Sequence, residues 1–393
     1  MAYEDPSTGN TLTNLIPPLY VALDTVSREL VGMIPAVTID AQVARAAIGQ
    51  TVYFPIAPAA TASNVAAAPV PPDDGEQVIG NMSLAITKSR RVPIRWQGEE
   101  SLQMENGGPG VQRILADQFA QAMRTLCNEI ESDLCNLYKY ASRGAIPNDT
   151  TLFKTNLADA ALVRKILADN GAPLSDLQLV LGTTEGAALR SLANLATTVP
   201  QGESMLRQGV LIDLYGMAVR ESAQIKVPAV GTANSGTLGS TDYDVGATSL
   251  ALAAAGTGSI LEGDMMTIAN TGDTTTQYVV RTGDADISDG GTIVISEPGL
   301  RKAITADNCA IAVYKSSARN LAFARSAIIL ATRIPALPQG GDMASGSRII
   351  TDPRSGLSFE VREYRQYRQV QYEVSIAWGV KAVKTEHIAI LAA

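Results

Sequence analysis

Few residues of this sequence could carry catalysis. The single histidine, His387, lies near the carboxyl terminus in a strand-like context, so a Ser-His-Asp triad or a histidine-rich metal site would have to use it. Neither a Gly-x-Ser-x-Gly turn nor a Gly-x4-Gly-Lys phosphate loop occurs in the chain. We therefore interpret His387 as a structural residue, and we expect no enzyme activity and no cofactor.

One acidic segment is similar to a calcium-binding loop. Residues 284–290 read Asp-Ala-Asp-Ile-Ser-Asp-Gly, but the sixth position is Asp289 instead of glycine and the twelfth is Ile295 instead of glutamate. A turn between two strands is the alternative that this composition favours. The sequence therefore predicts no metal site here.

The composition indicates a protein with a large core. The chain has 393 residues, of which 46% are hydrophobic and 18% charged, which is enough for two or three domains. The net charge of −8 argues against a nucleic-acid grip as the main task, because phosphate binding needs a basic face. Cys127, Cys135 and Cys309 form neither a disulfide framework nor a zinc cluster, so we expect them to be reduced. We expect no signal peptide and no membrane span, since the first residues are acidic and polar and long apolar runs contain Gly or Pro.

The longest periodic element is a predicted helix over residues 109–143. Pro109 suits its first turn, and Gly144 and Pro147 end it. Its apolar residues recur at helical spacing over about nine turns, which makes a rod about 50 Å long. We expect the following residues of this stripe to pack on a sheet: Ile114, Phe119, Met123, Leu126, Ile130, Leu134 and Leu137.

The opposite face of this helix is polar. Arg124, Asn128 and Glu131 belong to it, so we expect this face to be wet or to pack on polar surface. A coiled coil is the alternative, but it needs a second long helix, and no other segment has a comparable period.

Two segments before the helix cannot bury their own apolar residues. Residues 1–50 form a predicted arm with a short helical pattern, and residues 51–97 form a predicted two-stranded excursion. Its outgoing strand covers 51–55, and its returning part covers 82–86 and 91–96. An isolated hairpin is marginally stable in water, so we expect it to find partners in another copy of the chain.

The returning part of the excursion is basic. Lys88, Arg90, Arg91 and Arg95 either guard an exposed strand edge or form a docking strip for an acidic patch on an adjacent subunit. We take these four residues, together with Tyr53, Phe54 and Trp96, as candidates for contacts between subunits.

The remaining chain consists of α/β segments, a β-rich block that interrupts them, and a closing sheet. The helix and its flanks occupy 98–149, and a predicted α/β unit follows over 150–226. This unit contains a helix at 157–170, a strand at 177–181 and a second helix that begins at Thr183 or Thr184 and ends at Leu195. It ends with strands within 209–225 that turn at Tyr215-Gly216. Residues 227–317 carry ten acidic and four basic residues and short predicted strands at 265–269, 277–281 and 292–295, which is typical of an inserted small β-barrel or sandwich. Residues 318–346 resume the α/β style, and 347–393 form a closing antiparallel sheet with strands at 348–351, 357–363, 369–378 and 382–391.

This order of parts resembles the major capsid protein of tailed double-stranded DNA bacteriophages, with the Hong Kong 97 phage-type fold. The local matches are Asn-Leu-Ala-Phe-Ala-Arg-Ser-Ala at 320–327, Ser-Gly-Leu-Ser-Phe-Glu-Val at 355–361, Trp-Gly-Val at 378–380 and Glu386-His387. The β-rich insertion is similar to the immunoglobulin-like or telokin-like domain in coat proteins of the Salmonella short-tailed phage group.

The resemblance implies an α+β fold with an N-terminal arm, an extended hairpin (E-loop), a spine helix, a peripheral antiparallel sheet and an axial α/β domain. It implies a shell protein whose pentamers and hexamers form an icosahedral virion capsid around DNA, without sequence-specific binding and without a membrane. It also implies a separate scaffolding protein, a portal at one vertex and assembly in the bacterial host cytoplasm.

Two alternatives stay open. One is a non-viral shell-forming compartment protein of the same fold, which the sequence separates poorly from a phage capsid. The other is an extracellular β-rich adhesion or tail protein, which would contain repeats of the 227–317 block, whereas we find one copy.

Overall fold

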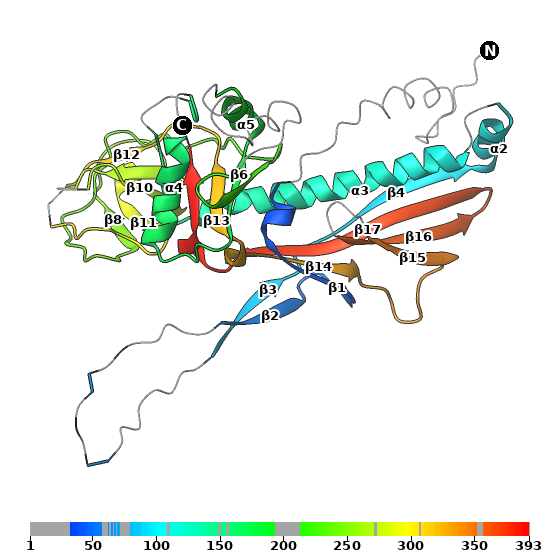
Figure 1. Ribbon diagram of the computed structural model, residues 1–393, viewed down its shortest axis with the longest axis horizontal. Coiled ribbons are helices and arrows are strands. Elements are labelled where there is room, and N and C mark those ends of the chain that lie inside the picture. The colour runs from blue at the N-terminus through cyan, green and yellow to red at the C-terminus, as the bar shows by residue number, and fades with distance from the viewer. Residues whose placement is uncertain are drawn as a thin grey trace.

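The computed structural model describes residues 32–56, 79–107, 111–147, 151–154, 157–192, 213–270, 273–305, 308–351 and 357–392, with positions 62, 64, 65, 67, 69 and 70. Within these residues a long helix lies along a six-stranded sheet, and a ten-stranded sheet forms the core of a second body at one end of the helix (Figure 1). A separate two-stranded hairpin extends away from both (Figure 1). The predicted α+β class, with one long helix against an antiparallel sheet, is confirmed. The predicted arm falls mostly on residues 1–31, which lie outside the described residues.

The spine helix is shorter than the sequence predicts. Helix α3 (Val111–Cys135) has 25 residues, about 37 Å, and follows a shorter helix α2 (Gly98–Gly107). The predicted end at Arg143 is wrong, because the chain changes at Cys135 to a 3-10 turn, η2 (Asn136–Tyr140), and then to strand β5 (Arg143–Ala145).

The apolar period cannot reveal this change, because the 3-10 turn still buries its apolar residues. Leu137 and Tyr138 are 6% and 4% exposed, and Ala141 is already extended. Gly144 serves the strand and not a helix end, since a Cβ atom there would lie 2.4 Å from the sulfur of Met265.

The predicted stripe of the spine helix faces the six-stranded sheet. Ile114, Leu126, Ile130 and Leu134 are at most 3% exposed, while Phe119 and Met123 pack against the same cluster from its margin. On the sheet side the cluster contains Val374, Ile376 and Trp378, which are fully buried. The Phe119 ring meets the Tyr372 ring edge to face, with 5.5 Å between centroids. Burying each large apolar side chain stabilises such a layer by about 1.5–3 kcal/mol.

The central strand of the six-stranded sheet is β17. Its 14 residues pair with β16 at one end, with β14 at the other, and with β4 over most of their length. The strands are β1 (Thr38–Ala46), β4 (Lys88–Gln97), β14 (Ile328–Pro335), β15 (Gly346–Thr351), β16 (Ser358–Gln366) and β17 (Gln369–Ala382). β1 runs parallel to β14, and the other pairs are antiparallel.

The hairpin is shorter than the predicted 51–97 excursion. Strands β2 (Thr51–Ile56) and β3 (Gly80–Ala85) pair with each other, whereas β4 pairs with β17 from Lys88 to Gln97 and belongs to the body. The physical reason is a buried face on β4, where Ile94 and Trp96 are 6% and 3% exposed and join the core under the spine helix.

The ten-stranded sheet unites segments from most of the chain. Its main path is β12-β9-β10-β5-β18-β13-β6-β7, with β11 attached to β10 and β8 attached to β11. The strands not yet given are β6 (Leu177–Leu181), β7 (Met217–Glu221), β8 (Ser249–Leu252), β9 (Met265–Ile268), β10 (Gln277–Thr282), β11 (Gly291–Ile295), β12 (Ile311–Val313), β13 (Asn320–Ala324) and β18 (Ile388–Leu391).

Helix α4 (Ala158–Asp169) lies within the predicted range 157–170 and packs on this sheet. Helix α5 (Thr183–Arg190) is shorter than predicted and has Gly182, not a threonine, at its N-cap. The Gly182 amide donates to Asn320 Oδ1 at 2.7 Å, so a side chain of the neighbouring strand β13 satisfies the N–H of the N-cap residue itself.

The last predicted strand is divided between the two sheets. β17 ends at Ala382, a 3-10 turn, η5 (Thr385–His387), follows, and β18 then pairs antiparallel with β13 and parallel with β5. The single predicted strand at 382–391 is therefore wrong, because η5 carries the chain from one sheet into the other.

The 227–317 block has its own apolar cluster, which includes Leu250, Tyr278 and Ile293. Its strands are nevertheless continuous with the larger sheet, because Gln277 and Tyr278 of β10 pair with Gly144 and Arg143 of β5. The inserted domain and its borders stay a prediction.

Candidate assembly surfaces

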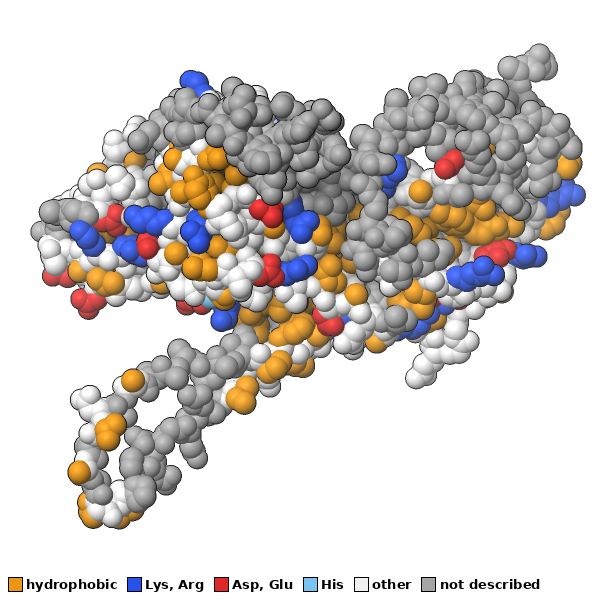
Figure 2. All heavy atoms as spheres, viewed as in Figure 1, with side chains coloured by type: hydrophobic (Ala, Val, Ile, Leu, Met, Phe, Trp, Pro, Cys, Tyr) orange, Lys and Arg blue, Asp and Glu red, His pale blue; other side chains and the backbone are white. Residues whose placement is uncertain are grey.

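The β2–β3 hairpin exposes apolar side chains. At its base, Val52 and Phe54 pack against a small cluster that contains Leu84, Ile86 and Ala377. Tyr53, which lies between them on the opposite face of β2, is 65% exposed, and Ile79, at the outer end of β3, is 66% exposed. Apolar side chains also lie along the described part of the hairpin in the space-filling view (Figure 2). An extended pair of strands with open apolar faces is stable only marginally in water, so this surface favours contact with another protein surface.

The base of the hairpin is fixed closely on the sheet. The Gly49 amide donates to the Ile86 carbonyl, and the Ile86 amide donates to the Gln50 carbonyl, both at 2.9 Å. A Cβ atom on Gly379 of β17 would lie 2.1 Å from the Ala85 carbonyl oxygen, so β3 crosses β17 where only glycine leaves room. The direction in which the hairpin leaves the body is therefore set by the sheet.

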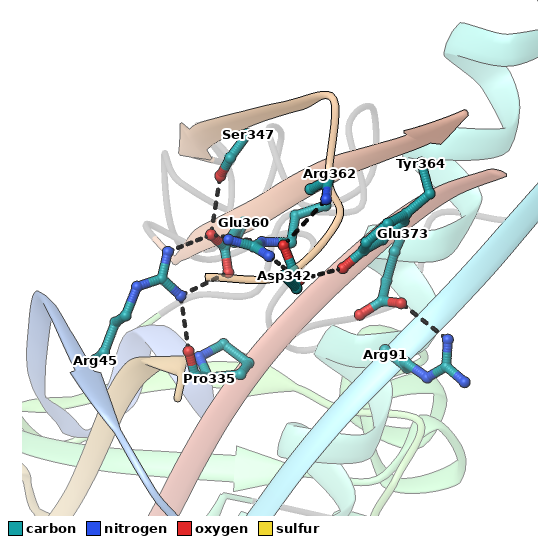
Figure 3. Close-up of polar contacts among 10 residues, drawn as sticks. Arg45, Arg91, Pro335, Asp342, Ser347, Glu360, Arg362, Tyr364 and Glu373 are labelled. Carbon is teal, nitrogen blue, oxygen red and sulfur yellow. Dashed lines mark hydrogen bonds and ion pairs between the residues drawn. The ribbon is translucent and has the colours of Figure 1, made fainter. Parts of the chain in front are cut away.

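The basic residues of β4 pair within their own chain. Lys88 Nζ lies 2.8 Å from Asp133 Oδ1, Arg90 Nε lies 2.9 Å from Glu129 Oε1, and both carboxylates are on the spine helix. Arg91 Nη1 lies 2.8 Å from Glu373 Oε2 (Figure 3). Arg95 is partly exposed. This geometry fits the guarded strand edge, and a role for these cations between subunits stays a prediction.

Trp96 is placed differently from the other predicted contact residues. Its side chain is 3% exposed, and its Nε1–H donates to Gln118 Oε1 of the spine helix at 2.9 Å. The prediction that Trp96 meets a neighbouring subunit is wrong in this structure, because the residue fills the core between β4 and the helix.

A network of charges joins β1, the loop before β15, and β16 (Figure 3). Glu360 accepts hydrogen bonds from Arg45 Nη2 at 2.6 Å and Nη1 at 3.1 Å, and from Ser347 Oγ at 2.9 Å. Arg362 Nε lies 3.0 Å from the same carboxylate, and its Nη1 pairs with Asp342, which also accepts from the Tyr364 hydroxyl at 2.7 Å.

The carboxylate of Glu360 is ionised in this network. Burial acts to raise its pKa, but the hydrogen bonds from Arg45, Arg362 and Ser347 outweigh burial and bring the pKa below its usual value. The Glu360 carboxylate thus joins β1 and β15 to β16, and the Arg362–Asp342 pair joins the loop before β15 to the same network.

The residues that could carry chemistry are structural in their surroundings. His387 is 7% exposed in η5, and burial lowers its pKa, so the imidazole is neutral near pH 7. In the acidic loop Asp284 accepts from the Asp286 amide at 2.9 Å and Asp286 accepts from the Ser288 amide at 3.1 Å, so these carboxylates form local turns. Within the described ranges, no group of three or more His, Cys, Asp or Glu side chains could hold a metal ion.

The sequence interpretation missed one site on the spine helix. Glu131 was assigned to the polar face, but it is 0% exposed and receives hydrogen bonds from the amides of Gly32, Met33 and Ile34. A signal was present, because Cys127, Leu134 and Cys135 place position 131 inside the apolar stripe at spacings of four, three and four residues. A carboxylate at such a position indicates a buried polar partner.

None of the helices that the structure describes is both long and apolar enough to cross a bilayer.

Comparison with known proteins gives structural likeness only. No family model matches the chain, and no curated protein matches it. The structure is similar to the capsid of the cyanophage P-SCSP1u, with a TM-score of 0.48, 10% identity, and coverage of 99% of this chain and 92% of the other. It is similar to a structure from Mycobacterium phage Che8, with a TM-score of 0.43, 12% identity, and coverage of 99% and 93%. It is also similar to the SrpI encapsulin of Synechococcus elongatus, with a TM-score of 0.38, 9% identity, and coverage of 99% and 91%.

Proposed function

We propose that this chain is the major capsid protein of a tailed double-stranded DNA bacteriophage and that copies of it assemble into an icosahedral shell. The observation that carries the proposal is the β2–β3 hairpin, which leaves the body with Tyr53 and Ile79 about two-thirds exposed (Figure 1). Such a surface is completed by another protein surface, and an identical copy is the partner that a closed shell supplies.

The shape of the described body supports the same function. The spine helix and the six-stranded sheet form an elongated layer that ends in the body built on the ten-stranded sheet (Figure 1). A protein of this outline can meet its neighbours at both ends and along both long edges, as a shell subunit must. The net charge of −8 fits enclosure of DNA without a sequence-specific grip on it.

The finer parts of the proposal rest on the sequence resemblance. In it, the α/β body meets its copies around the centres of pentamers and hexamers, and the 227–317 block is an inserted domain on the outer surface. A scaffolding protein guides assembly in the host cytoplasm, and a portal occupies one vertex.

Assembly of the protein, co-expressed with its genomic neighbours and imaged by negative-stain electron microscopy, tests the proposal. The wild type is expected to form closed particles that package DNA. A variant shortened within 61–76 is expected to give a folded subunit without particles. Particles that enclose protein cargo instead of DNA would favour the compartment alternative, and a wild type that never closes would contradict a shell function.

A matched pair of substitutions separates contact from folding. Tyr53→Ser changes a 65% exposed side chain on the hairpin, and Val245→Ser changes an equally exposed side chain on the 227–317 block. We expect the first to reduce particle yield more than the second, with equal circular dichroism spectra. Loss of the folded spectrum in Tyr53→Ser would place this side chain in a core.

A further inference from the structure

A groove lies at the end of the elongated body that is farthest from the 227–317 block (Figure 1). It is formed between the start of helix α2 and the turn that joins β16 to β17, and its volume is about 630 Å³. Leu102 of α2, which lines it, is 60% exposed, and Val370 of β17, which also lines it, is half-buried. We call it the tip groove. It offers open apolar surface large enough for an aromatic side chain.

The turn beside the tip groove presents a tyrosine outward. Tyr367 is 88% exposed and is not among the residues that line the groove next to it. The following residue, Arg368, has a φ of 56°, in the left-handed region that favours glycine. Its carbonyl oxygen accepts a hydrogen bond from the Gly98 amide at 3.0 Å, which ties the turn to the start of α2. A non-glycine residue held in this backbone conformation at an exposed turn indicates a functional constraint.

The tip groove also carries unpaired charges of both signs. Arg368 is exposed, and its guanidinium group forms no ion pair within the part of the chain that the structure describes. Glu99, in the first turn of α2, is also exposed and forms neither a hydrogen bond nor an ion pair with a described residue through its side chain. Since neither charge is neutralised within the chain, each is available to an opposite charge on another molecule.

We propose that Tyr367 of one copy inserts into the tip groove of a second copy, and that Arg368 of the first copy pairs there with Glu99 of the second. Tyrosine and arginine are enriched among the residues that dominate binding energy at interfaces. Each copy carries both halves of the contact on the same tip. Two copies related by a twofold axis can therefore exchange the contact, and a ring of copies can pass it from one to the next. The inference rests on the proposed function, because it takes an identical copy as the partner.

Charge reversal in the full-length protein tests the pairing. Arg368→Glu places two carboxylates together across the contact, and Glu99→Arg places two guanidinium groups together. We expect each change alone to raise the protein concentration at which half of the copies associate by about tenfold, as sedimentation velocity would report. The double variant is expected to recover most of this loss, because the opposite charges face each other again.

The matched control is Lys302→Glu, which reverses an exposed cation on the 227–317 block at the other end of the molecule (Figure 1). It is expected to associate as the wild type does. Equal association of Arg368→Glu and Lys302→Glu, or a double variant no better than either single one, would overturn the proposal.

Arg368→Gly separates the contact from folding. Glycine adopts the left-handed φ without strain, so this variant is expected to unfold at a urea concentration equal to or above that of the wild type. Its self-association is nevertheless expected to weaken, because the guanidinium group is gone. Association at the wild-type level in this variant would refute the role of Arg368.

Cross-linking distinguishes failure of this contact from failure of the shell. Tyr367→Cys protein is mixed with Leu102→Cys protein and treated with a short bismaleimide, to which the buried Cys127, Cys135 and Cys309 are closed. We expect linked dimers that contain one copy of each variant, and fewer when Val245→Cys, equally remote from the tip as Lys302, replaces Leu102→Cys. Closed particles without the link would keep the shell function and refute the tip contact, even if another protein covers the tip. Linked dimers without closed particles would keep the contact and contradict the shell function.

Discussion

Replacement of Glu360 by alanine should destabilise the protein far more than replacement of Glu363 on the same strand. The Glu360 side chain is 2% exposed and lies between Arg362, which is 7% exposed, and Arg45, which is 37% exposed. Its removal leaves the guanidinium group of Arg362 buried with Asp342 and the Tyr364 side chain as its remaining partners among the described residues.

The magnitude follows from these exposures. Breaking a buried pair by removing one partner costs about 3–5 kcal/mol, and Asp342 retains part of the compensation, so we expect a loss of about 3 kcal/mol in the free energy of unfolding at neutral pH. Glu363 pairs with Arg365 at exposures of 29% and 73%, and its replacement should cost about 0.2–1 kcal/mol.

Urea unfolding followed by tryptophan fluorescence measures both variants, because Trp96 and Trp378 are buried beside the spine helix. The sign of the pH dependence gives a second test. The pKa of Glu360 is lower in the folded state, so its contribution is present above the unfolded value, about 4.3, and is lost as the pH falls through the folded value. Losses that agree within about 0.5 kcal/mol for the two variants, or a difference that grows in acid, would refute the reasoning.

Three further outcomes are expected. Tyr53→Ser should leave the free energy of unfolding within about 0.5 kcal/mol of wild type, because the side chain is 65% exposed. Light scattering should show that the protein concentration needed for assembly rises more for Tyr53→Ser than for Val245→Ser, whose side chain is equally exposed. Gly379→Ala should lower the free energy of unfolding in urea by about 1–3 kcal/mol, since its Cβ atom would lie 2.1 Å from a carbonyl oxygen of β3. Gly346→Ala is the control and should be near neutral, because the nearest atom to its Cβ lies 3.9 Å away. Equal losses for the two variants would show that β3 does not cross β17 closely at Gly379. Leu134→Ala should cost about 2–5 kcal/mol in the same assay, because the side chain is 0% exposed, and a loss below about 1 kcal/mol would contradict its place in the core.

The elements that the sequence predicted well are those with a clear local period. The apolar spacing from Ile114 to Leu134 located the spine helix, and α4 and β6 follow the same logic. The end of the spine helix was predicted poorly, since Leu137 and Tyr138 are buried in a 3-10 turn just as they would be in an α-helix.

The functional surfaces depended on contacts that no local pattern contains. The sequence predicted residues 88–97 as the returning part of the hairpin. In the structure they belong to the body, because they pair with β17, which lies far along the chain and cannot be identified as their partner from a local pattern. Glu131 bonds to residues 97 to 99 positions away, and Arg45 bonds to Glu360 across 315 positions. A charged side chain is assigned to solvent by its type, and its burial becomes visible only when the distant partner is in place.

The hydrogen bonds that join Gly49 and Gln50 to Ile86 have a consequence for how this protein can change over evolutionary time. They close the two legs of the excursion before it leaves the sheet, so insertions, deletions or exchanged sequence between them do not pull on the strands that follow. The entropic cost of a longer loop grows slowly with length, by about 0.6 kcal/mol for each doubling. Descendants of this chain could therefore acquire a new reach, or a new neighbour, while the spine helix and its sheet keep their packing.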